Sequence, residues 1–262
     1  MTEITYERRY CLFFDVLGFS SKVGELPPQE IHNVLLEIRK CHNYREVYGK
    51  YTPDSLFSSR RVTQFSDCVV VSYKEGDFIG VISIISDVFH LQLRLLRYGF
   101  LVRGSVTIGE LYHDEHFCFG PALLKAVELE KRAIYPRVVL DDDFAKRSLL
   151  NNPTTRTSLS DGRYINNMVQ VDLDDMLYID YFNVISKDFN DDFDELFAYL
   201  NDLKRSIINL GERSIRDKNI ETKYLWMRNK FNDMTKRMLS DSGSKLYGYI
   251  APDVFKDIFK NI

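Results

Sequence analysis

An apolar segment that ends on a carboxylate constrains this chain most. Residues 10–14 (Tyr-Cys-Leu-Phe-Phe) are apolar and largely aromatic, which favours a buried β-strand. Asp15 follows directly, and a buried carboxylate is costly unless a cation or a hydrogen-bond donor pairs with it. Divalent metal ions are strong partners of this kind. Gly18 permits a sharp turn just beyond. We therefore expect a fold arranged around this strand, with Asp15 facing a metal ion.

A second stretch of the same character follows at residues 62–72. Its two short apolar strands are joined by Ser66 and Asp67, which predicts a hairpin with a carboxylate at its tip. The intervening chain is long enough for a helical crossover that makes the two strand segments neighbours. Asp15 and Asp67 would then converge and could hold a pair of divalent ions against a nucleoside triphosphate. The alternative is that each Asp is a turn residue or a helix N-cap.

The composition limits the broad class of protein. The chain has 262 residues, of which 45% are hydrophobic and 28% charged, which suits one globular domain or a catalytic domain with a helical extension. A net charge of −3 implies no general affinity for polyanions, so nucleic acid is not expected as a partner. The most apolar run, residues 78–96, contains Asp87 and Arg94, so no membrane span is expected. The four cysteines are scattered and form no CxxC pair, which is typical of reduced thiols in a cytoplasmic protein.

Periodicity along the chain predicts a mixed architecture. After the first strand and the hairpin, the patterns indicate a helix at 29–48 between them, then a helix at 78–98, a strand at 100–111, a helix at 120–132 and a strand at 135–140. This order predicts an α+β fold, a ferredoxin-like core with helices on one face of a mainly antiparallel sheet. Residues 1–150 are expected to form the catalytic core. Residues 151–262 are expected to add a strand near 176–185 and a helical extension packed on the core or on a dimer interface.

Four motifs together resemble one known family. Residues 14–19 (Phe-Asp-Val-Leu-Gly-Phe) resemble a first metal motif, and residues 64–72 resemble the hairpin that carries a second metal-binding Asp. Residues 102–109 are similar to the strand that follows, and residues 120–130 occupy the place of its next helix. The family is the class III nucleotide cyclases, and the likeness covers roughly residues 8–140.

The resemblance implies a set of site residues and a reaction. The implied ligands for two Mn²⁺ (or Mg²⁺) ions per site are Asp15, the carbonyl of Val16, and Asp67. The implied phosphate-binding groups are the backbone amides of Leu17, Gly18 and Phe19 and the guanidinium of Arg103. Asp15, Asp67 and Arg103 would be the catalytic residues. In the family, the ribose 3′-hydroxyl attacks the α-phosphate, pyrophosphate leaves, and two sites lie at a head-to-tail homodimer interface.

Several positions depart from the family pattern. Leu124 and Glu128 stand where the family has its transition-state Asn and Arg. Another cation or a partner chain would have to replace them, and the candidates in this chain are Arg61, Arg97, Lys125 and Arg132. The two base-reading positions of adenylate-specific members are occupied here by Thr63 and Phe117, which argues against adenine.

This combination resembles the bacterial pyrimidine cyclases of the Pycsar antiphage systems. It implies conversion of UTP to cyclic UMP, a second messenger that acts on a separate effector protein. Tyr48 and Tyr51 precede the hairpin and could stack on a pyrimidine. The alternatives are a cytidylate cyclase that converts CTP to cyclic CMP, a non-catalytic cyclase-like protein that only binds nucleotide, and a scaffold that acts through its C-terminal helices.

Overall fold

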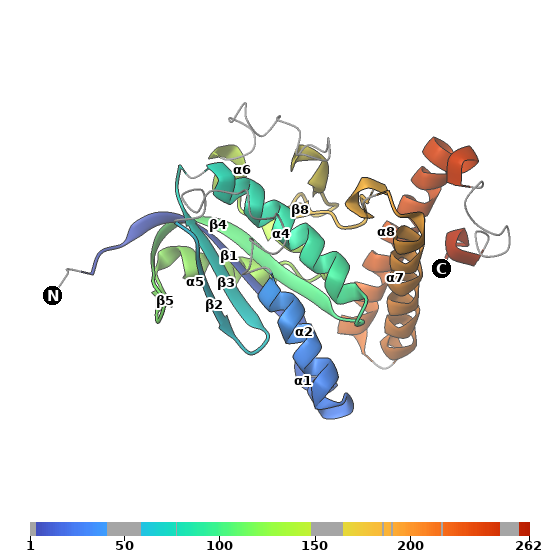
Figure 1. Ribbon diagram of the computed structural model, residues 1–262, viewed down its shortest axis with the longest axis horizontal. Coiled ribbons are helices and arrows are strands. Elements are labelled where there is room, and N and C mark those ends of the chain that lie inside the picture. The colour runs from blue at the N-terminus through green and yellow to red at the C-terminus, as the bar shows by residue number, and fades with distance from the viewer. Residues whose placement is uncertain are drawn as a thin grey trace. The chain divides into compact units, whose positions relative to one another are not determined.

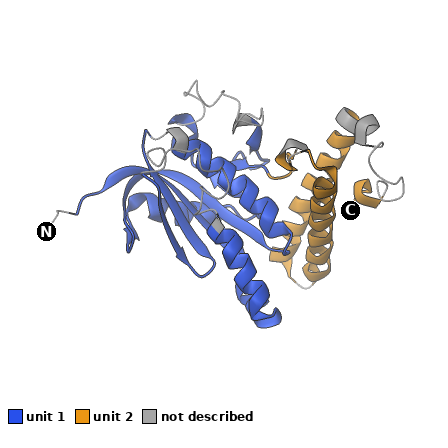
Figure 2. Ribbon diagram, in the orientation of Figure 1, with its two compact units in different colours: residues 1–180 blue, residues 181–262 orange. Residues whose placement is uncertain are grey.

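The chain forms two compact units, residues 1–180 and 181–262 (Figure 2). The computed structural model describes residues 4–40, 59–76, 78–147, 165–184, 186–189, 191–215, 217–246 and 257–262. No helix in these ranges is long and apolar enough to cross a membrane.

The first unit is built on a sheet whose centre is β1 (Glu7–Leu17). β3 (Cys68–Lys74) and β4 (Leu101–His113) flank β1, and both run antiparallel to it. β2 (Arg61–Phe65) forms the expected hairpin with β3. The order β2-β3-β1-β4 means that each helical crossover passes over one intervening strand, which is the ferredoxin-like arrangement. The predicted α+β, ferredoxin-like core is therefore confirmed (Figure 1).

The sheet continues beyond β4. α5 (Pro121–Arg132) leads from β4 to β6 (Val138–Leu140), which pairs parallel with β4. Such a parallel neighbour requires a crossover connection, and α5 supplies it. A short strand, β5 (Cys118–Phe119), folds back on the end of β4.

Two further strands complete the sheet. β8 (Leu177–Ile179) pairs with β6, and β7 (Val169–Val171) pairs with β8. The sequence predicts one strand in this region and misses β7. Because both strands hydrogen-bond into the sheet, the first compact unit extends to residue 180, whereas the sequence places the core boundary after residue 150.

Helices cover both faces of the sheet, whereas the sequence predicts them on one. α1 (Phe19–Glu25) follows β1 directly, α2 (Pro28–Lys40) contacts α4 (Phe78–Leu96), and α4 packs on the sheet face that carries Tyr73. On the opposite face, hydroxyls on β4 donate hydrogen bonds to carbonyls of α5, from Ser105 to Ala126 (2.7 Å) and from Thr107 to Ala122 (2.9 Å). α4 thus connects β3 to β4 across one face, and α5 lies on the other face in the connection from β4 to β6 (Figure 1).

The described chain also contains shorter helical elements. The first unit holds α6 (Asp142–Ala145) and η4 (Ile165–Met168), and the second unit holds η5 (Ser186–Phe189).

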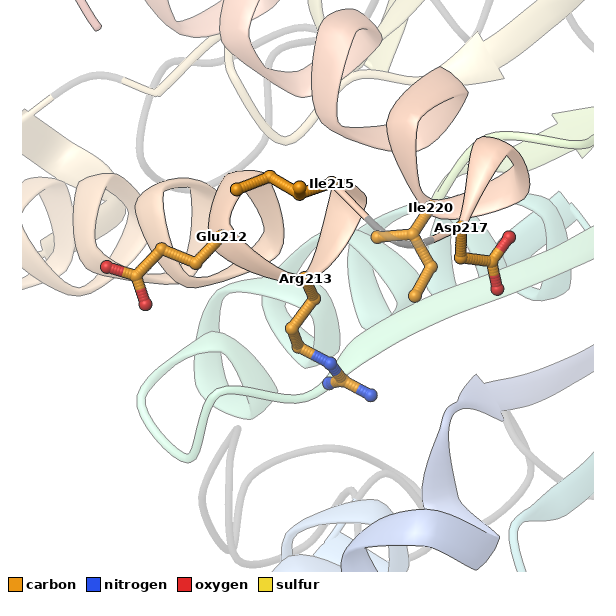
Figure 3. Close-up of a pocket in the computed structure, with 5 residues that line it drawn as sticks. All are labelled: Glu212, Arg213, Ile215, Asp217 and Ile220. Atoms are coloured by element: carbon orange, nitrogen blue, oxygen red, sulfur yellow. The ribbon is translucent and has the colours of Figure 1, made fainter.

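The second unit contains the expected C-terminal helices. α7 (Phe193–Ser214) begins at Asp192, whose side chain accepts a hydrogen bond from the amide of Glu195 (3.1 Å). α8 (Lys218–Leu246) contacts α7, and apolar side chains of both helices are buried, among them Leu200 of α7 and Phe231 of α8. A pocket at the turn between them is lined by Glu212, Arg213, Ile215, Asp217 and Ile220 (Figure 3). None of the site residues expected from the sequence lines it.

Candidate functional site

The structure brings the two expected acidic residues together. The paired register of β1 and β3 ends at Phe14 and Val69, so Asp15 and Cys68 are the next residues on adjacent strands. Asp67 lies in the two-residue tip of the hairpin, and one donor atom from each of Asp15, Asp67 and Cys68 falls within 4.8 Å of the others. The convergence follows from the antiparallel pairing, because it places the end of β1 beside the start of β3.

The electrostatics of this cluster favour a bound cation. Burial raises the pKa of Asp15, and the negative charge of Asp67 raises it further. Burial and the charge of Asp15 raise the pKa of the Cys68 thiol to about 12, so the thiol stays protonated and donates to Asp15 (3.5 Å). Two carboxylates in repulsive contact offer the oxygen ligands that Mg²⁺ and Mn²⁺ prefer. The two carboxylates therefore fit a divalent ion, and the protonated Cys68 thiol beside them is not expected from the sequence.

The turn after Asp15 has the geometry that the sequence predicts. Val16 is buried, and Leu17 forms the last pair with β4. Gly18 has φ 71° and caps α1, a conformation that favours glycine. A Cβ at this position would touch nothing within 4 Å, so the requirement for glycine is one of backbone conformation. Phe19 is buried near the ring of Phe100, with 6.2 Å between the ring centroids. The amides of residues 17–19 thus lie next to the acidic cluster, and their contact with phosphate stays a prediction.

Arg103 lies opposite Asp15 in the register of β1 and β4. Its Nε donates to the carboxylate of Glu130 on α5, which is only 4% exposed. Among the described residues, Glu130 is the only recorded partner of Arg103. Arg103 is expected from the sequence as a phosphate ligand, whereas Glu130 is not expected at this site. No local pattern identifies Glu130, because it belongs to the charged surface of a helix until the fold buries it.

The other expected residues are distributed around the same sheet. Thr63 lies on β2 and bonds to His113 (3.0 Å). Phe117 is 63% exposed, beside β5. Tyr48 and Tyr51, the proposed stacking residues, fall outside the described residues. Of the candidate cations, Lys125 forms an ion pair with Asp141 (2.8 Å).

Comparisons with known proteins give a distant likeness only. No protein-family model and no curated protein sequence matches the chain. The adenylyl cyclase CyaB from P. aeruginosa is 13% identical over 55% of this chain and 81% of its own, with a TM-score of 0.44. A bacterial light-regulated adenylyl cyclase is 16% identical over 56% of this chain and 82% of its own, with a TM-score of 0.43. An adenylate/guanylate cyclase/hydrolase from Silicibacter pomeroyi is 14% identical over 66% of this chain and 95% of its own, with a TM-score of 0.35. Likenesses of this size assign no residue role, substrate or family to this chain.

Proposed function

We propose that the chain is a nucleotide cyclase of the class III type, which closes a nucleoside triphosphate to its cyclic 3′,5′-monophosphate and releases pyrophosphate. The observation that carries the proposal is the convergence of Asp15 and Asp67 at the end of the central strand of a ferredoxin-like sheet. The motifs at residues 14–19 and 64–72 support it, because they place the same two acids in cyclase-like surroundings. The catalytic chemistry is assigned to residues 1–150.

The residues of this chain have separate roles in the proposal. Asp15, Asp67 and the carbonyl of Val16 hold the divalent metal, proposed to be Mn²⁺. When bound, the metal neutralises triphosphate charge and lowers the pKa of the attacking hydroxyl. The amides of residues 17–19 bind phosphate oxygens. Arg103 contacts phosphate through its terminal nitrogens, since its Nε is held by Glu130.

The charge that the family places on the next helix is missing. Leu124 is 69% exposed and Glu128 is acidic, so neither residue stabilises an anionic transition state. Losing one such donor typically costs about 2.7–4 kcal/mol. We propose that a second copy of the chain supplies the missing groups in a homodimer. Phe65 supports this, because it is 81% exposed and offers apolar surface in the hairpin that carries Asp67.

The substrate in this proposal is UTP, and the product is cyclic UMP, a messenger for a separate effector protein in antiphage defence. Its support is the resemblance to pyrimidine cyclases and the absence of the adenine-reading pattern at Thr63 and Phe117. CTP is the alternative substrate. Since nucleoside triphosphates are cytoplasmic metabolites, the proposed place of action is the cytoplasm. The missing Asn and Arg favour one second candidate, a protein that binds nucleotide without turning it over.

The test is an incubation of the purified chain with Mn²⁺ and ATP, GTP, CTP or UTP separately, with products resolved by mass spectrometry. We expect cyclic UMP from UTP and none from ATP. Asp67→Ala should abolish the product while circular dichroism shows a folded protein. Absence of every cyclic product from the dimeric, metal-loaded wild type would overturn the cyclase assignment. Retained triphosphate binding in that case would favour the nucleotide-binding candidate.

A further inference from the structure

A chain of hydrogen bonds crosses the sheet from β1 to β2. Arg9 on β1 donates from Nε to the hydroxyl of Ser72 on β3 (2.9 Å). That hydroxyl bonds to Nδ1 of His113 at the end of β4 (2.8 Å). Nε2 of His113 bonds to the hydroxyl of Thr63 on β2 (3.0 Å). We call these four residues the relay, and each of the first four main strands of the sheet contributes one of them.

The first half of the relay has a direction. Arginine can only donate hydrogen bonds, so the Ser72 oxygen accepts from Arg9. Ser72 is fully buried, and within the described parts of the chain the one acceptor near its own hydrogen is Nδ1 of His113. Leaving a buried hydroxyl hydrogen unpaired is costly. Ser72 therefore donates to Nδ1, and Nδ1 of His113 carries no proton.

The second half follows from the charge of His113. Its side chain is buried, and burial together with the positive charges of Arg9 and Arg61 lowers the pKa of His113 to about 4. The imidazole is therefore neutral near pH 7 and carries one proton, which must be on Nε2. Nε2 donates that proton to the Thr63 oxygen. Thr63 is half-buried, and its hydroxyl hydrogen has no acceptor among the residues that the structure describes.

Thr63 shares a face of the sheet with the acidic cluster. Thr63 and Phe13 both pair with Val70, and Asp15 is the next residue of β1 on that face. Thr63 lies two strands away from β1 and two residues along the strand direction from Asp15. This places the two residues at a distance on the order of 12 Å. A nucleoside triphosphate is long enough to reach from the metal ligands to Thr63.

We propose that the relay fixes Thr63 as a hydrogen-bond donor that recognises a carbonyl oxygen of the substrate base. Thr63 is the binding residue, and His113 and Ser72 are positioning residues. The inference rests on the proposed function, because it takes the ligand to be a pyrimidine triphosphate. Uracil offers carbonyls at positions 2 and 4, whereas cytosine has an amino group at position 4. A donor facing position 4 therefore selects uracil, and a donor facing position 2 selects neither base.

The relay itself is tested without any ligand. NMR of the ¹⁵N-histidine-labelled full chain at pH 7 should show His113 as the neutral Nε2–H tautomer, with its signals assigned by their loss in His113→Gln. Ser72→Ala removes the donor to Nδ1, so the tautomer preference should weaken in that variant. A charged imidazole or the Nδ1–H tautomer in the wild type would overturn the relay.

The base contact is tested with substrate analogues in the presence of Mn²⁺. Thr63→Val should raise KM for UTP roughly three- to tenfold with little change in kcat, since a neutral hydrogen bond is lost from binding. Thr63→Ser, which retains the hydroxyl, should stay close to the wild type. The wild type should discriminate against either 2-thio-UTP or 4-thio-UTP, because sulfur is a weaker acceptor, and Thr63→Val should lose that discrimination. The analogue affected identifies the carbonyl.

Each outcome separates the inference from the proposed function. If Thr63→Val forms cyclic UMP with the KM and analogue preference of the wild type, the base contact is refuted and the cyclase assignment stands. If the wild type forms no cyclic product but binds UTP, the cyclase assignment fails, and the same comparison made on dissociation constants decides the contact. If the wild type binds no triphosphate, both are overturned.

Discussion

Replacing Asp67 by Asn should have opposite effects on the metal-free protein and on its response to metal. Without a cation, Asp15 and Asp67 are carboxylates in a part-buried cluster, and the charge of Asp67 raises the pKa of Asp15. Asn keeps the shape of the side chain and removes one charge. The metal-free variant should therefore be more stable than the wild type, and it should lose the stabilisation that metal provides.

The structure sets the size of the repulsion, and the metal concentration sets the size of the response to metal. The donor atoms of the two carboxylates lie within 4.8 Å. Two unit charges at that separation repel by about 1–3 kcal/mol for effective dielectric constants between those of water and a protein surface. A metal at a hundred times its dissociation constant stabilises the folded state by about 2.7 kcal/mol. Each kcal/mol corresponds to about 2–4 °C in Tm for a chain of roughly this length.

Thermal unfolding followed by circular dichroism at pH 7.5 and low ionic strength measures both effects, with EDTA in one series and Mn²⁺ in the other. Glu115→Gln, which removes one exposed carboxylate from the turn before β5, is the matched control. We expect Asp67→Asn to melt above the wild type in EDTA and to show almost no shift with Mn²⁺. The control should follow the wild type in both series.

Two results would refute this reasoning. A lower Tm for metal-free Asp67→Asn would mean that the carboxylates do not repel in the folded protein. A rise in Tm with Mn²⁺ as large in the variant as in the wild type would mean that the metal binds elsewhere.

Three further predictions concern other charged groups. Glu130→Gln should lower kcat/KM for UTP about tenfold, because a neutral amide holds Arg103 less firmly than a carboxylate does. An unchanged kcat/KM in steady-state kinetics would exclude this positioning role of Glu130. The pKa of His113 lies at about 4, below its ordinary value, so the stability that neutral His113 contributes is present above pH 6.5 and is lost as the pH falls through 4. Urea unfolding of the wild type should show this loss as a decrease of about 2–3 kcal/mol in the free energy of unfolding. The decrease should be absent in His113→Gln. Burial raises the pKa of Asp87 to about 7 although Arg60 lies 3.7 Å away, so the stabilising contribution of protonated Asp87 is complete below pH 3.8 and is lost as the pH rises through 7. Asp87→Asn should therefore gain stability relative to the wild type between pH 5 and pH 8. An equal difference in unfolding free energy between variant and wild type at pH 5 and pH 8 would contradict this.

Local patterns were sufficient for most secondary structure in this protein. The apolar run before Asp15 predicted β1, and the Ser66-Asp67 turn predicted the hairpin of β2 and β3. Nineteen residues in α4 form a helix despite many β-branched side chains, as their length and apolar character predicted. β7 was missed because its three residues lie in a mostly polar stretch, whereas the equally short β6 and β8 lie within longer, more apolar runs.

The tertiary structure alone decided which side chains meet. The convergence of Asp15 with Asp67 was an expectation until strand pairing placed the end of β1 beside the start of β3. Glu130 and His113 had no recognisable role in the sequence, since their partners Arg103 and Thr63 lie far along the chain. Periodicity reports which face of an element is buried, whereas long-range hydrogen bonds and the order of strands determine what that face touches. The sequence by itself therefore determined the elements and the two acids, and the folded sheet decided the site.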